Sequence, residues 1–210
     1  MHQDQACAFP GKRESGDEHR LAIAAAARAI IYEVGLEGLR TRDIAARVGI
    51  NIATLHYHVP TKEALVALVA DSLRQEFKAQ AQRNSRAGRT PLEQLRLEFA
   101  DFHDSVHETP QLIVVLSALI EKGRRDPAIG AIMTPLYDYW RMQFVEIFRQ
   151  GVADGTFRPD LEPHSAALIT TGALSDYSRQ WTSFRASYDQ LTAELERAFI
   201  ASSNSSKDVS

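Results

Sequence analysis

One stretch of the sequence constrains the fold more than any other: residues 41–62, TRDIAARVGINIATLHYHVPTK. Gly49 stands where a left-handed residue lets the chain reverse after a short helix. Asn51 predicts the cap of a second short helix, which must end before Pro60 because proline disfavours helix at the preceding residue. The apolar side chains at helical spacing are Ile44, Ala45, Val48, Ile50 and Leu55. They predict two helices that cross closely, as in a helix-turn-helix.

The second of these predicted helices carries hydrogen-bonding side chains, which favours contact with DNA over simple packing. Hydroxyl and cationic groups at the helix starts are placed to bind phosphates. An ordinary helical hairpin with no role in nucleic-acid binding is the alternative that the apolar spacing alone leaves open. The candidate DNA-binding residues are Thr41, Arg42, Asn51, Ala53, Thr54, His56, Tyr57, His58 and Lys62.

Residues 41–65 resemble the DNA-binding signature of the TetR family of bacterial transcriptional repressors. The matching residues are Thr41, Ile44, Ala45, Gly49, Thr54, Leu55, Tyr57, His58, Pro60, Lys62 and Leu65. Two positions depart from the family pattern, with His56 in place of the usual tyrosine and Val59 in place of phenylalanine. The phosphate contact of that tyrosine is therefore not carried over to His56, whereas valine still suits an apolar site. The resemblance implies an all-helical repressor that binds DNA.

Length, charge and cysteine content are consistent with a cytoplasmic DNA-binding protein. The chain has 210 residues, enough for one sizeable core, or for one core and a small satellite domain. Its net charge is −3, yet residues 11–62 hold eight basic and six acidic residues, so the acidic excess lies elsewhere. The amino terminus lacks the apolar core of a signal peptide, and no apolar run approaches the ~20 residues that span a bilayer. The single cysteine, Cys7, fits a reducing cytoplasm.

Hydrophobic periodicity predicts an all-α fold with two domains. A three-helix helix-turn-helix domain is expected over residues 15–60. A larger helical-bundle domain, for ligand binding and dimerisation, is expected over residues 61–202, joined to the first through one continuous helix over residues 61–82. The polar segments 1–14 and 203–210 are predicted to be disordered tails.

Helix start and stop signals place the individual helices. A capping box at Ser15 is expected to open the first long helix, and Thr61 and Thr90 are expected to cap later ones. Pro135 is expected to kink or break the helix that contains it. Residues 112–120 are apolar on nearly every side, which predicts a helix at the centre of the larger domain.

Residues 137–148, YDYWRMQFVEIF, form the aromatic centre of the chain. Their helical spacing favours core packing, with the wall of a ligand pocket as the alternative, and both can hold at once. The resemblance to TetR-like proteins implies a small-molecule effector in the second domain. By that resemblance, the candidate lining residues are Phe102, His103, Trp140, Phe144 and Tyr177.

Two histidines, His103 and His107, lie one helical turn apart and raise the question of a metal site. Zinc needs a third and usually a fourth ligand, and the sequence offers no obvious partner, so we expect neither a metal nor a cofactor. Gly-x-Ser-x-Gly, paired-carboxylate and phosphate-loop patterns are also missing from the sequence, so we expect no enzymatic activity.

Small residues gather on the predicted helix that follows Pro163, where they would let another helix approach closely. Packing within the same subunit is the alternative. In the resembling family the last two long helices of each subunit form a four-helix dimer interface, and a palindromic operator requires a two-fold dimer. The candidate interface residues are Ala166, Thr170, Gly172, Ala173, Leu191 and Leu195.

Together these features predict a homodimeric repressor that binds a palindromic operator and is released by a small-molecule effector. One alternative is a helical ligand-binding protein or enzyme whose helix-turn-helix is only structural. Another is an architectural DNA-binding protein without an effector. Strongly salt-dependent binding to one DNA sequence would separate the first alternative from a repressor.

Overall fold

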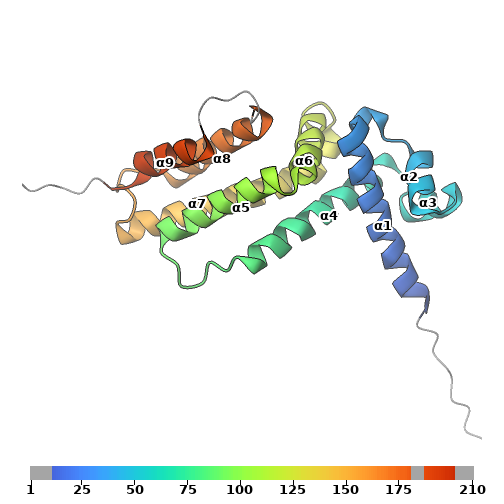
Figure 1. The fold of residues 1–210 in the computed structure, drawn as a ribbon, viewed down its shortest axis with the longest axis horizontal. Helices are drawn as coiled ribbons and strands as arrows, with labels where there is room; N and C mark the ends of the chain where they lie inside the picture. The colour runs from blue at the N-terminus through green and yellow to red at the C-terminus, as the bar shows by residue number, and fades with distance from the viewer. Residues whose placement is uncertain (1–10, 181–186, 202–210) are drawn as a thin grey trace, which may run out of the picture. The chain divides into compact units, whose positions relative to one another are not determined.

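The computed structural model describes residues 11–180 and 187–201, which are built of α-helices (Figure 1). The elements are α1 (Gly11–Val34), the 3₁₀ turn η1 (Leu36–Gly38), α2 (Thr41–Val48), α3 (Ile52–His58), α4 (Lys62–Arg83), α5 (Pro91–His107), α6 (Pro110–Gly123), α7 (Pro127–Asp154), α8 (Pro163–Gln180) and α9 (Tyr188–Phe199). Within the described ranges, extended pairing is limited to one isolated bridge between Phe157 and Ile200. The all-α prediction is therefore confirmed, whereas the predicted tail at 203–210, like Cys7, lies outside the described residues.

The chain divides into two compact units. The first contains the residues up to Phe77 together with Val114–Met133, and the second contains Lys78–Ile113 and the residues from Thr134 onward. Helices α4, α6 and α7 thus each have residues in both units. The predicted domains were defined by function, which this division does not test, so their boundary at residue 60 stays a prediction.

Helix α1 provides much of the buried surface of the first unit. Its buried side chains include Ile23, Ala27, Ile30 and Ile31. The predicted capping box at Ser15 is wrong, because the helix begins at Gly11 and a cap must stand outside its helix. Residues 11–14, expected in a disordered tail, are helical, since lysine, arginine and glutamate are good helix formers. The helix ends before Gly35, whose φ of 75° is left-handed.

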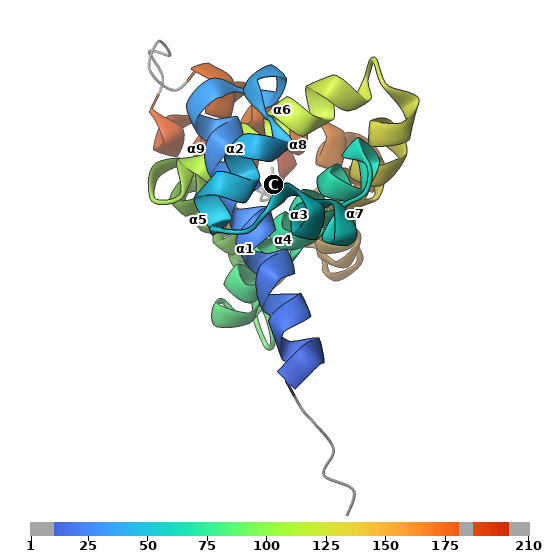
Figure 2. The same cartoon turned by 90° about the vertical axis from the view of Figure 1, so that its right-hand side faces the viewer.

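The helix-turn-helix forms as its spacing predicts, with α1, α2 and α3 lying together (Figure 2). Helix α2 ends at Gly49, where a φ of 78° turns the backbone and its N–H donates to carbonyl oxygens in the last turn. The Asn51 side chain caps α3, accepting a hydrogen bond from the backbone N–H of Thr54 at 2.7 Å. Ile44 of α2 and Leu55 of α3 are fully buried. A polar cap and an apolar contact thus fix the orientation of α3.

A hairpin formed by α6 and α7 completes the first unit. Gly123 and Gly130 approach so closely that a Cβ added at Gly130 would lie 2.8 Å from the carbonyl oxygen of Gly123. Lys122 also donates from Nζ to Oε1 of Glu37 in η1 at 3.1 Å. The ion pair connects this hairpin to the chain segment that leads into α2.

Two expectations concern α6 and α7. The expectation that residues 112–120 lie at the centre of the larger domain stays a prediction: Leu112, Ile113, Val115 and Leu119 are buried, but residues 114–120 belong to the first unit. The Val114 side chain is also 44% exposed. Pro135 does not break its helix, because α7 continues through it to Asp154.

The predicted caps at Thr61 and Thr90 are confirmed. Thr61 accepts a hydrogen bond from the backbone N–H of Ala64 at 3.1 Å. Thr90 and Glu93 form a complete capping box, with Glu93 accepting from the Thr90 N–H at 2.8 Å. Local chemistry therefore starts both α4 and α5.

The second unit combines an apolar core with a buried ion pair. Its buried side chains include Leu95, Phe99, Phe144, Phe148, Phe157 and Phe199. The Arg86 guanidinium pairs with the buried carboxylate of Glu98 and donates to Oε1 of Gln143 at 3.0 Å. Burial raises the pKa of Glu98, and the charge of Arg86 opposes that rise. This pair links the α4–α5 connection to α5 and α7.

Candidate nucleic-acid interface

Helix α3 presents one face to solvent, which we call its outer face: Ile52, Ala53, His56 and Tyr57. Tyr57 is 84% exposed and Ile52 is 49% exposed. Leu55 points the other way and is fully buried. Because residues 52 and 56, like 53 and 57, are one helical turn apart, the outer face is continuous along α3.

Three of the residues predicted to contact DNA are engaged elsewhere or partly buried. The Asn51 side chain caps α3, and Thr54 is half-buried. His58 is half-buried as well, with its ring centroid 5.5 Å from that of His19. Burial lowers the pKa of His58, and the nearby His19 and Arg20 lower it further. A neutral, packed imidazole is poorly suited to bind a phosphate.

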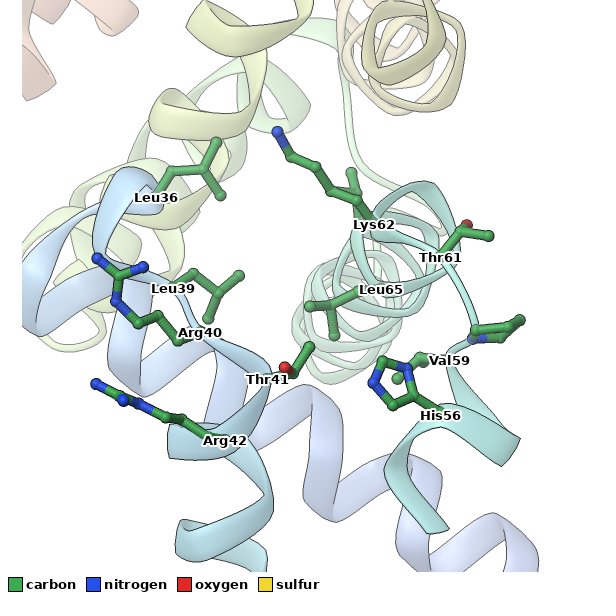
Figure 3. A pocket seen from close by; sticks show the side chains of 12 residues that line it. Leu36, Leu39, Arg40, Thr41, Arg42, His56, Val59, Thr61, Lys62 and Leu65 are labelled. Carbon is green, nitrogen blue, oxygen red and sulfur yellow. The ribbon is translucent and has the colours of Figure 1, made fainter. Parts of the chain in front are cut away.

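Cationic side chains line a cleft beside the outer face (Figure 3). The cleft has a volume of about 670 Å³ and lies between the η1–α2 and α3–α4 connections. Arg40 and Arg42 reach out on the side of η1 and α2, and His56 and Lys62 lie on the side of α3 and α4 (Figure 3). The apolar side chains that line it are Leu36, Leu39, Val59, Pro60, Leu65 and Val66. Thr41, at the start of α2, also borders the cleft.

The cations near the cleft differ in how far they are already neutralised. Arg47 of α2 is held by Glu33 through two hydrogen bonds of 2.8 Å. Arg42 has the carboxylate of the next residue at 3.4 Å, but its side chain remains 74% exposed. Arg40 and Lys62 form no ion pair with the side chains that the structure describes, those of residues 16–179 and 187–201. Their charges are therefore available to a phosphate backbone.

Two residues at this surface, Arg40 and Ile52, are not among those predicted from the sequence. Arg40 directly precedes the predicted start of α2. A cation beside a helix start is placed to bind a phosphate, so its position could have indicated this role. Ile52 is harder to find, because apolar side chains on a predicted helix are usually assigned to packing. It also stands three residues before Leu55, a spacing that usually puts two side chains on the same helical face, so the sequence held no signal that Ile52 is exposed.

An aromatic cluster in the second unit unites three of the predicted pocket residues. The rings of Phe102 and Trp140 stack with centroids 5.7 Å apart, and Trp140 meets Phe144 edge-on, also at 5.7 Å. Next to them, the Arg141 guanidinium lies 4.9 Å from the centroid of the Tyr137 ring. The buried Nε of Arg141 has no hydrogen-bond partner among the described residues. These residues form an apolar cluster with an unsatisfied donor nearby.

The other two predicted pocket residues, His103 and Tyr177, lie against Tyr188, with ring centroids 5.1 and 5.0 Å away. Tyr188 is anchored by a hydrogen bond of 2.6 Å from its hydroxyl to a backbone carbonyl of α5. The rings of His103 and His107 are 4.3 Å apart. Across the described ranges, no group of three or more His, Cys, Asp and Glu side chains is placed to hold a metal ion.

The predicted dimer residues fall on different faces of α8 and α9. Those buried within the chain, and so closed to a second copy, are Ala166, Thr170 and Leu195. Ala173 and Leu191 are half-buried, and Gly172 is exposed with no atom within 4 Å of an added Cβ. Leu168 and Ile169, which are not among the predicted residues, are 57% and 56% exposed. They form an outward apolar face with Gly172.

Comparison with known proteins identifies the family. Residues 23–69, which include α2 and α3, match the model of bacterial regulatory proteins of the tetR family. The HTH-type transcriptional repressor KstR2 of Mycolicibacterium smegmatis is 29% identical over 161 residues, which are 73% of this chain and 73% of that protein. KstR2 of Mycobacterium tuberculosis is 28% identical over 144 residues, covering 65% of this chain and 68% of the relative.

Solved structures share the fold over most of the chain. A TetR-family regulator from Agrobacterium tumefaciens has a TM-score of 0.75 at 19% identity, covering 89% of this chain and 100% of its own. A transcriptional regulator from Saccharomonospora viridis, solved in complex with choline, has a TM-score of 0.77 at 22% identity, with coverages of 89% and 100%. The ketosteroid transcriptional regulator KstR2 of M. tuberculosis has a TM-score of 0.63 at 22% identity, with coverages of 87% and 95%.

Among the described residues, no helix is both long and apolar enough to cross a membrane. The family match falls on the segment that carries the outer face of α3 and the cationic cleft, and the relatives it accompanies are repressors. The chain belongs to the TetR family and is a helix-turn-helix transcriptional repressor of TetR type, not an enzyme.

Proposed function

We propose that this repressor acts in the cytoplasm as a homodimer on a palindromic operator, and that a small-molecule effector bound in the second unit releases it. The observation that carries the DNA-binding part is the outer face of α3 flanked by cationic side chains, of which Arg42 is 74% exposed although Asp43 lies 3.4 Å away. Base edges would meet the outer face in the major groove, while Arg40, Arg42 and Lys62 contact the phosphates on either side.

Dimerisation through α8 and α9 follows from the requirements of the operator and from an uncovered apolar surface. One copy presents one α3, and a palindrome has two half-sites, so a two-fold dimer is needed to bind both. Leu168, Ile169 and Gly172 supply an apolar face with a small residue at which a second helix can approach closely. We therefore propose Leu168, Ile169 and Gly172 as the dimer contacts, in place of Ala166, Thr170 and Leu195, which were predicted from the sequence but are buried within the chain.

The effector site is proposed at the aromatic cluster of the second unit. Phe102 and Trp140 form a stacked apolar pair, and the buried Nε of Arg141 is a donor without a partner among the described residues. An effector with an apolar body and a hydrogen-bond acceptor would satisfy both. The names of related proteins suggest probes to begin with: a ketosteroid, after KstR2, and choline, after the complexed regulator.

Selection of duplexes from a random DNA pool, followed by titration at several salt concentrations, tests the DNA-binding proposal. Replacing Tyr57 with alanine should weaken binding to the selected operator. Lys62→Ala should weaken binding to every duplex and lower the slope of log affinity against log salt by about one. Lys78→Ala, at an exposed lysine of the same helix, is the matched control and should change neither.

Unchanged operator affinity in both the Tyr57 and Lys62 variants would remove α3 as the recognition helix. Weak, salt-insensitive binding by the parent protein would instead favour a helix-turn-helix that is only structural.

A further inference from the structure

The outer face of α3 is unusual in what it offers to base edges. Side chains that commonly pair with bases in the major groove are arginine, lysine, asparagine and glutamine. Between residues 51 and 58 the sequence contains only one of these, Asn51. The base contacts of α3 must therefore come mainly from other side chains.

Asn51 is not free to recognise a base in the usual way. Recognition of adenine by asparagine uses the amide oxygen and the amide nitrogen together. The Asn51 oxygen already accepts the backbone N–H of Thr54 at 2.7 Å and caps the helix. Turning it toward DNA would leave that N–H without its partner, at the cost of the cap.

In the first turn of α3, the exposed side chains are the apolar Ile52 and Ala53, whereas Thr54 is half-buried and Leu55 is buried. In a helix-turn-helix the first residues of the recognition helix are those that contact base edges. Among the groups displayed in the major groove, the C5-methyl of thymine is the apolar one. Apolar side chains in this position select thymine by removing its methyl group and their own surface from water.

We propose that Ile52 is a specificity-determining residue that recognises a thymine methyl in each half-site. The proposal rests on the proposed DNA-binding function and adds the chemical class of base that the first turn selects. Ala53 is short, so Ile52 reaches furthest from this turn. Its 49% exposure is of no consequence alone, since single exposed apolar residues are common. What gives it meaning is its place on the outer face, next to cations that would hold DNA there.

Replacing thymine by deoxyuridine removes only the C5-methyl group, and so tests the proposal directly. The unaltered protein is first used to select an operator from a random duplex pool. Each thymine of that operator is then replaced in turn, symmetrically in both half-sites, and the affinity is measured. At one position per half-site the replacement should weaken binding by roughly four-fold for each methyl group removed.

The Ile52→Ala variant should lose this dependence, binding the thymine and deoxyuridine operators equally at that position. Ile52→Val, which keeps a β-branched side chain, should retain part of it. Val34→Ala is the matched control, because Val34 is 61% exposed but lies outside α3. It should respond to deoxyuridine as the parent protein does.

Two results would overturn the role of Ile52. One is an operator on which no thymine methyl matters. The other is a deoxyuridine effect that is the same in the parent protein and in Ile52→Ala. Failure of the underlying DNA-binding function is distinguishable from both, because then no operator would be selected at all. Helical circular dichroism and urea unfolding verify that each variant is folded.

Discussion

Side chains that accept hydrogen bonds from free backbone N–H groups define where several helices begin. Asn51 and Ser187 accept from the N–H three residues ahead, at 2.7 and 3.2 Å, and Thr61 does the same at 3.1 Å. Glu162 serves α8 in a related way, accepting from the N–H groups of the two residues that follow Pro163, at 3.0 and 2.7 Å. Its carboxylate also meets the positive end of the helix dipole.

The Glu162 cap predicts a pH dependence of stability. Hydrogen bonding by the Ser165 hydroxyl, and then by the backbone N–H groups of His164 and Ser165, lowers the pKa of Glu162 from 4.5 to about 2. Because the folded-state pKa lies below the unfolded-state value, the stabilisation is present above about pH 4.5 and is lost as the pH falls toward 2. Urea unfolding should therefore show Glu162→Ala less stable than the parent at neutral pH, with the difference shrinking below pH 4.5.

The Glu162→Gln variant separates the contribution of the negative charge from that of the hydrogen-bond acceptor, because glutamine retains a side-chain oxygen but does not titrate. Its stability should fall between those of the parent and Glu162→Ala at neutral pH. A difference between parent and alanine variant that stays constant with pH would show that the carboxylate does not cap α8.

At the scale of elements, the α6–α7 hairpin depends on two glycines that permit close backbone contact. An added Cβ at Gly123 would lie 3.0 Å from the Cα of Gly130, and one at Gly130 would lie 2.8 Å from the carbonyl oxygen of Gly123. Backbone atoms cannot yield as the end of a flexible side chain can. The hairpin therefore needs glycine for space at these positions, not for an unusual φ.

Gly130→Ala is accordingly expected to lower the free energy of unfolding by ~1–3 kcal/mol through overpacking. Gly16→Ala is the matched control within the same unit, because Gly16 is also helical but has no atom within 4 Å of an added Cβ. That substitution should raise stability by about 0.5–1 kcal/mol, the usual gain on replacing a glycine inside a helix. Equal stabilisation by both changes, measured by urea unfolding, would contradict the close contact.

At the scale of the whole molecule, DNA binding and effector binding are proposed for different units. Helices α4, α6 and α7 each have residues in both units. The sequence predicts α4 alone as the link between the two sites, whereas the structure offers three covalently continuous routes. Any coupling between the sites must also act on a dimer whose half-sites lie ~34 Å apart.

The proposed dimer predicts a specific effect at Gly172. Because no atom lies within 4 Å of an added Cβ there, Gly172→Leu cannot overpack the isolated chain. It should weaken the dimer by ~1–3 kcal/mol if a second helix approaches at this point. Sedimentation at a series of concentrations measures this effect, with Ala153→Leu on exposed α7 surface as the control. A Gly172→Leu dimer as stable as the parent would place the interface elsewhere.

The proposed effector response predicts reciprocal coupling. An effector that releases the operator by ~1–3 kcal/mol must itself bind more weakly, by the same factor, when operator is present. Trp140 fluorescence should report the titration of a ketosteroid or choline, and Trp181→Phe removes the second tryptophan signal. Equal affinity with and without operator would refute the allosteric part of the function while leaving the DNA-binding part intact.

The sequence by itself determined the features that arise from neighbours along the chain. The all-α fold follows from helical periodicity. The turn at Gly49 and the caps at Asn51, Thr61 and Thr90 follow from contacts within a few residues, whose partners a linear sequence displays. The helix-turn-helix and its family signature could be predicted for the same reason. The wrong prediction of a helix cap at Ser15 shows the limit of such local signals, because a capping residue competes with the helix propensity of the residues before it.

Only the tertiary structure decided which sides of the helices are buried, because burial depends on partners far away in sequence. It turned Ile52 outward and Leu55 inward on α3, and it buried Thr170 while exposing Leu168 on α8. It also joined Val114–Met133 to the unit that carries the helix-turn-helix. Periodicity reveals that a helix has an apolar side, but removal of that side from water requires a surface supplied by another part of the chain.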